Sequence, residues 1–141
     1  MRIEFTIKGN HQDPFGNAFP KLKMTGKQHW MPKAQAYAMW KSYVQNALLK
    51  SGLPIDLIDR FNKSLAFKGK PIELEKGQHA RMDLLIAWKD GHHGDPENIF
   101  GSIADALFVN DKNLWGSFSP LVGEHGGKVV CIITVSDALI E

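Results

Sequence analysis

Residues 94–111, with the sequence GDPENIFGSIADALFVND, decide the fold of this chain. Asp95 is a favourable helix N-cap, and Pro96 suits the first helical position. Apolar side chains then recur at helical spacing along the segment: Ile99, Ile103, Ala106 and Leu107. The pattern predicts a helix from about Pro96 to Phe108, with a turn after it.

Strands are predicted on both sides of this helix. Apolar and polar residues alternate in part over residues 80–88, and residues 114–118 and 128–135 also resemble strands. A glycine-rich turn at residues 123–127 separates the last two. Residues 2–8, at the start of the chain, alternate so that their apolar side chains fall on one side.

A second helix is predicted earlier in the chain, from Lys33 to about Lys50. Its apolar residues form one broad face: Ala34, Tyr37, Ala38, Val44, Ala47 and Leu48. Residues 53–77 are mixed and predict a short helix and one strand. Together these elements predict a single domain of the α/β (α+β) class over residues 1–141, in which two main helices pack on a small mixed sheet.

Length and composition agree with one domain. The chain has 141 residues, of which 43% are hydrophobic, and domains commonly span about 50 to 250 residues. The single cysteine, Cys131, excludes a disulfide framework and favours a reducing setting. No apolar run approaches the ~20 residues of a membrane span, and the first residues do not resemble a secretory signal. We therefore expect a cytoplasmic protein.

Charge is distributed unevenly along the chain. Residues 14–55 contain no Asp or Glu and carry six lysines: Lys21, Lys23, Lys27, Lys33, Lys41 and Lys50. The window is therefore strongly basic in a chain whose net charge is only +2, and the remainder is acidic. Such a window favours contact with a phosphate backbone. The alternative interpretation is a solvated, lysine-rich loop and helix face.

Three carboxylates, Asp95, Glu97 and Asp111, suit the binding of a divalent metal ion. Magnesium prefers oxygen ligands and commonly uses one or two carboxylates together with substrate phosphate oxygens. A proline at the first helical position leaves Asp95 outside the helix, where it could turn toward Glu97. The alternative interpretation is an ordinary helix start, in which Asp95 caps the helix and Glu97 favours the positive end of its dipole. The adjacent His92-His93 lacks the spacing of a zinc site.

The order of these parts resembles the RusA family of Holliday-junction resolvases. Members of that family show Asp-x-Asp-Asn at the start of a helix, Asp-Ala-Leu near its end and an acidic pair before the next strand. The matching segments here are Asp95-Pro96-Glu97-Asn98, Asp105-Ala106-Leu107 and Asn110-Asp111. The basic loop and the first helix, with Tyr37 and Trp40, are also similar to the DNA-contacting region of the family. The resemblance covers most of the chain, and its specific part is residues 94–115.

The resemblance implies a homodimeric endonuclease from a bacterial cell, phage or prophage that acts on branched DNA. Its cofactor would be Mg²⁺, with Mn²⁺ as a substitute. Asp95, Glu97 and Asp111 would form the metal-binding and catalytic cluster. The residues expected to contact the DNA backbone are Lys21, Lys23, Lys27, Lys33 and Lys41.

Two positions depart from the family pattern. Glu97 stands where the family usually has Asp, which moves the carboxylate about one methylene further out. Gly101 stands where the family has a catalytic lysine, whose ammonium would stabilise phosphoryl charge. Lys112 and Lys89 are candidates for that role because they lie close to the acidic segment, although each also fits an exposed surface lysine.

The length of the predicted helix separates the three acids. Residues 97–108 would span roughly 17 Å in a continuous helix, which places Asp111 far from Asp95 within one chain. We therefore expect either an interrupted helix, or a dimer in which Asp111 of one subunit approaches Asp95 and Glu97 of the other.

The leading hypothesis from the sequence is a dimeric, magnesium-dependent endonuclease that resolves Holliday junctions or other branched DNA in recombination and repair. Two-fold symmetry suits this reaction, because a four-way junction needs two matched cuts. One alternative is a branched-DNA-binding protein of the same fold with weakened catalysis, which Gly101 favours. The other is a metal-dependent phosphohydrolase of small nucleotides, which would need fewer phosphate contacts than the long basic window offers.

Overall fold

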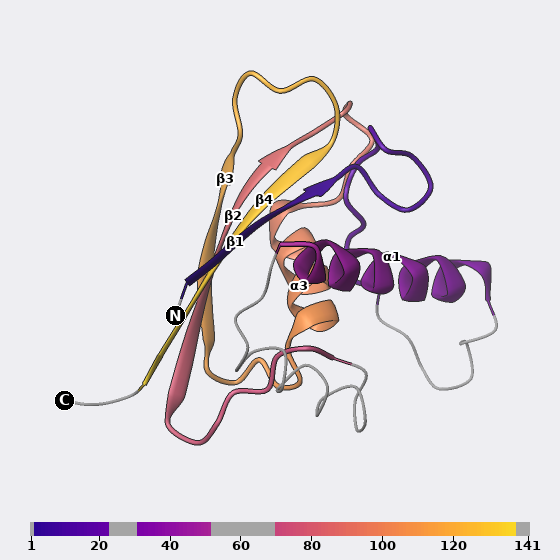
Figure 1. Cartoon of the computed structure of the whole chain (residues 1–141). Coiled ribbons are helices and arrows are strands. Elements are labelled where there is room, and N and C mark those ends of the chain that lie inside the picture. The colour runs from indigo at the N-terminus through magenta and orange to yellow at the C-terminus, as the bar shows by residue number, and fades with distance from the viewer. Residues whose placement is uncertain (1, 23–30, 52–69, 138–141) are drawn as a thin grey trace.

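The computed structural model describes residues 2–22, 31–51 and 70–137. Within these ranges the chain forms one four-stranded sheet and two helices (Figure 1). In chain order the elements are β1 (Arg2–Lys8), α1 (Pro32–Leu49), β2 (Gln78–Ala87), α3 (Pro96–Leu107), β3 (Leu114–Pro120) and β4 (Lys128–Asp137). The predicted α+β class is therefore confirmed, and each of these six elements overlaps one expected from the sequence.

The sheet is mixed, with the strand order β1-β4-β2-β3. Strand β4 runs antiparallel to both of its neighbours, whereas the edge strand β3 runs parallel to β2. The pairing register places four residues in one row across the sheet: Phe5, Cys131, Leu84 and Phe118. Because side chains alternate along a strand, the whole row faces the same side.

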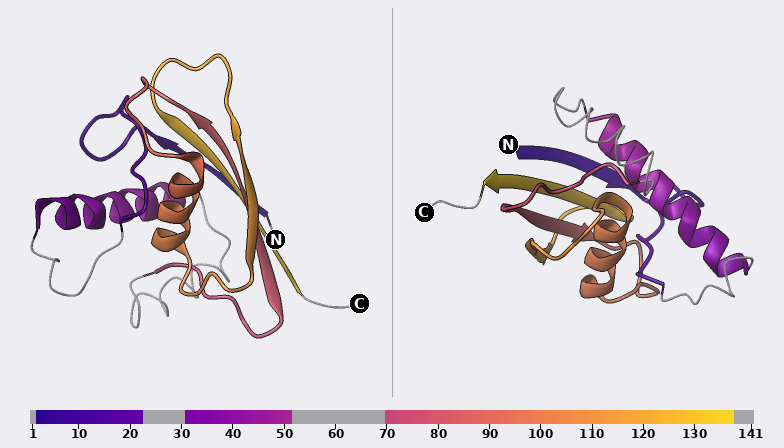
Figure 2. Two further views of the ribbon diagram at one scale, coloured as in Figure 1. Left: turned by 180° about the vertical axis from the view of Figure 1, so that it is seen from behind. Right: turned by 90° about the horizontal axis from the view of Figure 1, so that it is seen from below.

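Both helices cover that side of the sheet (Figure 2). Helix α1 buries Tyr37, Trp40, Val44 and Leu48, and helix α3 buries Ile99, Ile103, Ala106 and Leu107. These side chains meet the buried residues of the strands in a single hydrophobic core. The other side of the sheet carries the exposed polar residues of β1 and β2, which include Arg2, Glu4, Lys8 and Arg81.

Helix α3 is continuous and ends one residue before the predicted end. Phe108 leaves the helix with extended dihedral angles, φ −107° and ψ 131°, and forms a parallel β-bridge with Ile72. The bridge is held by backbone hydrogen bonds from Ile72 N to Leu107 O (2.8 Å) and from Val109 N to Ile72 O (2.9 Å). Of the two arrangements expected for the acids, the interrupted helix is therefore wrong.

Cys131 is fully buried in β4 and forms no disulfide. Burial raises the pKa of its thiol, because the thiolate would lose its solvation. The predicted short helix and strand at 53–77 fall mainly on residues 52–69, outside the described part of the chain. No helix in the described residues has the length and apolar character to cross a membrane.

Candidate functional site

The N-terminal end of α3 presents two exposed acidic side chains, Asp95 and Glu97. Asp95 occupies the N-cap position in an extended conformation, but its carboxylate makes no capping hydrogen bond. Its backbone carbonyl instead accepts the N–H groups of Asn98 (2.9 Å) and Ile99 (3.0 Å). The predicted N-cap position of Asp95 is confirmed. The predicted capping hydrogen bond from its side chain is absent.

The loop before Asp95 is tied to the loop that follows β1. The amide Nδ2 of Asn17 donates to Asp90 Oδ1 (3.1 Å) and to the His92 carbonyl (3.0 Å). Its Oδ1 accepts the backbone N–H of Lys89 at 2.6 Å. One asparagine therefore joins two segments more than 70 residues apart in sequence and positions the chain that enters α3.

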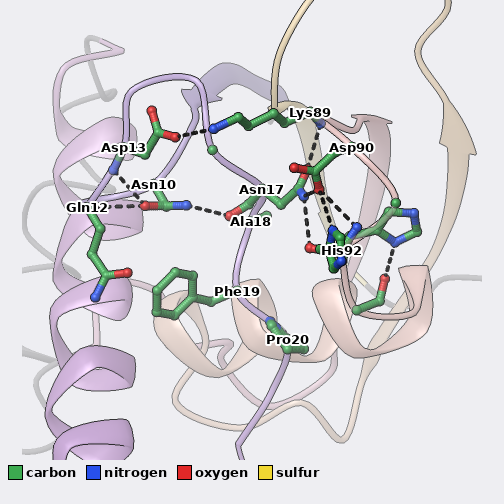
Figure 3. A pocket seen from close by; sticks show the side chains of 14 residues that line it. Asn10, Gln12, Asp13, Asn17, Ala18, Phe19, Pro20, Lys89, Asp90 and His92 are labelled. Atoms are coloured by element: carbon green, nitrogen blue, oxygen red, sulfur yellow. Dashed lines mark hydrogen bonds and ion pairs between the residues drawn. The ribbon is translucent and has the colours of Figure 1, made fainter.

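A cavity of about 710 Å³ lies between these two loops. Its walls come from residues 10–20 and 89–94 (Figure 3). Asn10 is one of the lining residues, and its Oδ1 holds the first loop by accepting the backbone N–H groups of Gln12 (2.8 Å) and Asp13 (2.9 Å). Gly94 also lines the cavity and directly precedes Asp95, the N-cap residue of α3.

The charged groups of this cavity are largely paired. Lys89 Nζ lies 2.9 Å from Asp13 Oδ2, and this hydrogen bond lowers the pKa of the Asp13 carboxyl and raises that of the Lys89 ammonium. The backbone N–H of His92 lowers the pKa of Asp90. Because Lys89 is held by Asp13, it is a poor candidate for the role of the lysine absent at Gly101.

At the C-terminal end of α3, Asp105 binds three side chains from two other segments of the chain. Its carboxylate accepts hydrogen bonds from Lys70 Nζ (3.0 Å) and the Tyr37 hydroxyl (2.9 Å), and Lys41 Nζ lies 3.7 Å away. Burial alone would raise the pKa of Asp105, but the hydrogen bonds from Lys70 and Tyr37 and the charges of Lys41 and Lys70 lower it overall. The pKa of Tyr37 is raised by burial and by its bond to Asp105. Asp105 is therefore held as a carboxylate.

Asp111 lies with this second group. It lines a cavity of about 230 Å³ together with Lys21, Lys70, Asp105 and Asn110. Among the described residues, no three His, Cys, Asp or Glu side chains come together in a way that could hold a metal ion. Within one chain, the predicted trio of Asp95, Glu97 and Asp111 is therefore divided between the two ends of a helix about 18 Å long.

The predicted lysines have different environments. Lys21, Lys33 and Lys112 are exposed, and the backbone N–H of Lys112 donates to Asn110 Oδ1 (2.9 Å) in the turn after α3. Lys41 is half-buried, and its ammonium lies over the Tyr37 ring, 5.1 Å from the centroid. Lys23 and Lys27 lie outside the described residues.

Residues 19–21 lie along helix α3. The Ser102 hydroxyl donates to the Phe19 carbonyl at 2.5 Å, and the backbone N–H of Lys21 donates to the Asn98 carbonyl at 2.9 Å. A Cβ placed on Gly101 would lie 3.3 Å from Lys21 Cδ. The Lys21 side chain therefore passes over Gly101.

Asp105 and Lys70 were not among the site residues predicted from the sequence. One signal could have identified Asp105, because Glu97, Gly101 and Asp105 are spaced by four residues and share one face of α3. Lys70 gave no such signal, since only the tertiary fold brings it to the helix.

The number of exposed carboxylates at the N-terminal end of α3 agrees with the requirements of a magnesium ion. Magnesium retains several waters and needs only one or two protein carboxylates when substrate phosphate supplies the remaining oxygens. Asp95 and Glu97 offer two exposed carboxylates, and neither forms an ion pair within the described residues. The chain does not match any protein-family model or any curated protein with which it was compared.

Proposed function

We propose that this protein is a magnesium-dependent endonuclease of the RusA type, which cuts branched DNA such as four-way junctions. The observation that carries the proposal is that the Asp95 carboxylate is exposed and makes no capping hydrogen bond. It stands at a helix N-cap position without making the cap, beside a second exposed carboxylate at Glu97. A residue present only to start the helix would be expected to use its side chain for the N–H groups of the first turn.

Asp95 and Glu97 would hold the metal, and the substrate phosphate would complete its oxygen ligands. Magnesium, when bound, supplies positive charge beside the scissile phosphate. In the reaction, water adds to phosphorus, one bridging P–O bond breaks and the leaving oxygen takes up a proton. Each cut thus gives one phosphomonoester end and one hydroxyl end.

The basic residues would bind the DNA backbone without reading bases. Lys21 and Lys33 are exposed, and Lys33 and Lys41 both lie in α1, about two helical turns apart. Contacts to phosphate position a protein on DNA but carry no sequence information. Recognition would therefore depend on the shape of the branch, and affinity should fall as salt rises.

A homodimer would explain why Asp111 is separate from the other acids. In that arrangement Asp111 of one subunit completes the site formed by Asp95 and Glu97 of its partner. Mixing two inactive proteins, Asp95→Asn and Asp111→Asn, tests this arrangement. Mixed dimers then contain one fully intact site and regain nicking, whereas acids contributed within one subunit leave both sites damaged and no activity returns.

The test of the proposed function is incubation of the protein with labelled four-way junction DNA and Mg²⁺ or Mn²⁺. We expect paired cuts near the branch point, and loss of cutting with retained binding for Asp95→Asn and Glu97→Gln. Glu4→Gln serves as the control, because Glu4 is an exposed carboxylate on β1. Cutting by Asp95→Asn at the normal rate would contradict the assignment.

A second candidate function is junction binding without cleavage. The division of the acids between the two ends of α3 favours it, as does the glycine at position 101. Binding without incision in either metal would support this candidate over the endonuclease. Displacement of the DNA by mononucleotides at low concentration would instead favour a nucleotide phosphohydrolase.

A further inference from the structure

Two aromatic rings are stacked in the segment between β2 and α3. The His93 imidazole lies over the Trp88 indole, with ring centroids 3.7 Å apart and an angle of 6° between the ring planes. The His93 ring is also 2.8 Å from the Gly94 carbonyl through Nδ1, and this nitrogen donates because a carbonyl oxygen can only accept. Two contacts therefore fix the plane and the direction of the imidazole before a ligand binds.

The second face of this imidazole is open to solvent. His93 is exposed, whereas Trp88 is half-buried, so the indole covers one face of the imidazole and leaves the other uncovered. His93 also belongs to the lining of the cavity of about 710 Å³ between the two loops. There is therefore space beside the ring for a further planar group.

The stacked pair adjoins the carboxylates at the start of α3. Trp88 and Pro96 line the same small pocket, of about 110 Å³, and Pro96 stands between Asp95 and Glu97 in the sequence. His93 precedes Asp95 by two residues, which span at most about 7 Å of chain. A group stacked on His93 would therefore belong to a nucleotide next to a phosphate held beside Asp95.

The charges of the cavity favour a neutral ligand over an anion. Asp13 is paired with Lys89 at 2.9 Å, and Asp90 contributes a second carboxylate to the lining. With histidine counted as neutral, the lining carries one net negative charge. A phosphate would be repelled there, whereas a nucleobase is uncharged and can donate an amino hydrogen to a carboxylate.

We propose that the open face of His93 is a stacking platform for an unpaired nucleobase of the branched DNA, next to the cut. This role rests on the proposed action on DNA and adds a means of selecting branches. Stacking on an aromatic ring tolerates every base, because each base has a π-face. A base must leave its pair to reach His93, and this step costs least where the base is already unpaired. Linear duplex DNA would therefore gain nothing from the platform.

The test compares the affinities of wild type and His93→Ala for two labelled DNAs in EDTA, where no cutting occurs. One is a four-way junction with unpaired nucleotides at its centre, and the other is a fully paired linear duplex. Loss of one base stack should weaken binding of the junction by about fivefold to a hundredfold. Binding of the duplex should change less than about twofold.

An abasic nucleotide identifies the base that stacks. At the position concerned, removal of the base should weaken the wild type by the same factor as His93→Ala. The abasic nucleotide should then weaken His93→Ala hardly at all, because the two changes remove one and the same contact. Additive losses at every unpaired position would overturn the proposal.

Two further variants separate stacking from other roles of the histidine. His93→Phe keeps an aromatic face and should bind the junction within about twofold of wild type. His92→Ala is the matched control, because the His92 side chain is 98% exposed at the neighbouring position, and it should leave affinity unchanged. Binding by His93→Phe as weak as that by His93→Ala, or an equal loss on duplex and junction, would overturn the stacking platform.

The outcomes distinguish the platform from the proposed function. If the wild-type protein binds and cuts junctions while His93→Ala behaves like His92→Ala, the platform is wrong and the endonuclease proposal stands. If the wild-type protein neither binds nor cuts junction DNA, both are wrong. Coupling between His93 and the unpaired base in a protein that does not cut supports the platform and favours junction binding without cleavage.

Discussion

Replacement of Ser102 by alanine should destabilise the protein, because one buried hydroxyl connects three parts of the fold. Ser102 is fully buried in α3. Its Oγ accepts the indole N–H of the buried Trp40 in α1 (3.1 Å) and donates to the Phe19 carbonyl (2.5 Å). Ser102→Ala removes both hydrogen bonds and leaves the Trp40 N–H without a partner in the core.

The expected loss follows from these two bonds. An unsatisfied buried donor costs about 1–3 kcal/mol, and the lost bond to the Phe19 carbonyl adds about 1 kcal/mol. Alanine recovers up to about 0.5 kcal/mol through its higher helix propensity. We therefore expect the free energy of unfolding to fall by about 1.5–3.5 kcal/mol.

Urea denaturation of Ser102→Ala and Ser42→Ala measures this difference. Ser42 is exposed in α1, so its replacement has the same propensity gain and no buried hydrogen bond to lose. Replacement of Trp40 by Phe in the Ser102→Ala protein should then cost less than it does in the wild type, because the orphaned N–H disappears. Equal stabilities of the two serine variants would refute the reasoning.

Two further substitutions test other parts of the structure. Asp105→Asn should lower the free energy of unfolding by about 1–2 kcal/mol at neutral pH. Folding lowers the pKa of the Asp105 carboxyl. The carboxylate therefore stabilises the protein above its unfolded pKa of about 3.9, and this stabilisation is lost as the pH falls through the folded pKa. In urea denaturation, the difference in the free energy of unfolding between the wild type and Asp105→Asn should be smaller at pH 3 than at pH 7. Gly116→Ala should destabilise by about 1–3 kcal/mol or more, since its Cβ would lie 2.0 Å from Met82 O and 2.5 Å from a Phe100 ring carbon. Gly91→Ala, where no atom lies within 4 Å of the added Cβ, should leave the melting temperature nearly unchanged.

The elements could be predicted from the sequence because local signals agreed with the tertiary structure. Asp95-Pro96 and the apolar stripe that follows marked helix α3, and alternation marked β1 and β2. The end of α3 was harder to predict, since Phe108 leaves the helix and pairs with Ile72, a residue distant in sequence. A parallel bridge of this kind has no local sequence signal.

The site could be predicted only in part, for the same physical reason. The exposure of Asp95 and Glu97 follows from their place in the first turn of an amphipathic helix. The group around Asp105 depends on Lys70, Lys41 and Tyr37, which reach it from two other segments. The contact of Lys21 with Gly101 likewise depends on how residues 19–21 cross α3.

The central claim is that Asp95 helps to hold the metal that cuts branched DNA. Its most direct test is single-turnover cleavage of a labelled four-way junction in Mg²⁺ by the wild-type protein and Asp95→Asn, with binding measured separately in EDTA. The account predicts paired cuts by the wild type, and for Asp95→Asn equal binding with cleavage slower by at least about a hundredfold. Cleavage by Asp95→Asn at the wild-type rate, or no cleavage by the wild type in either Mg²⁺ or Mn²⁺, would contradict it.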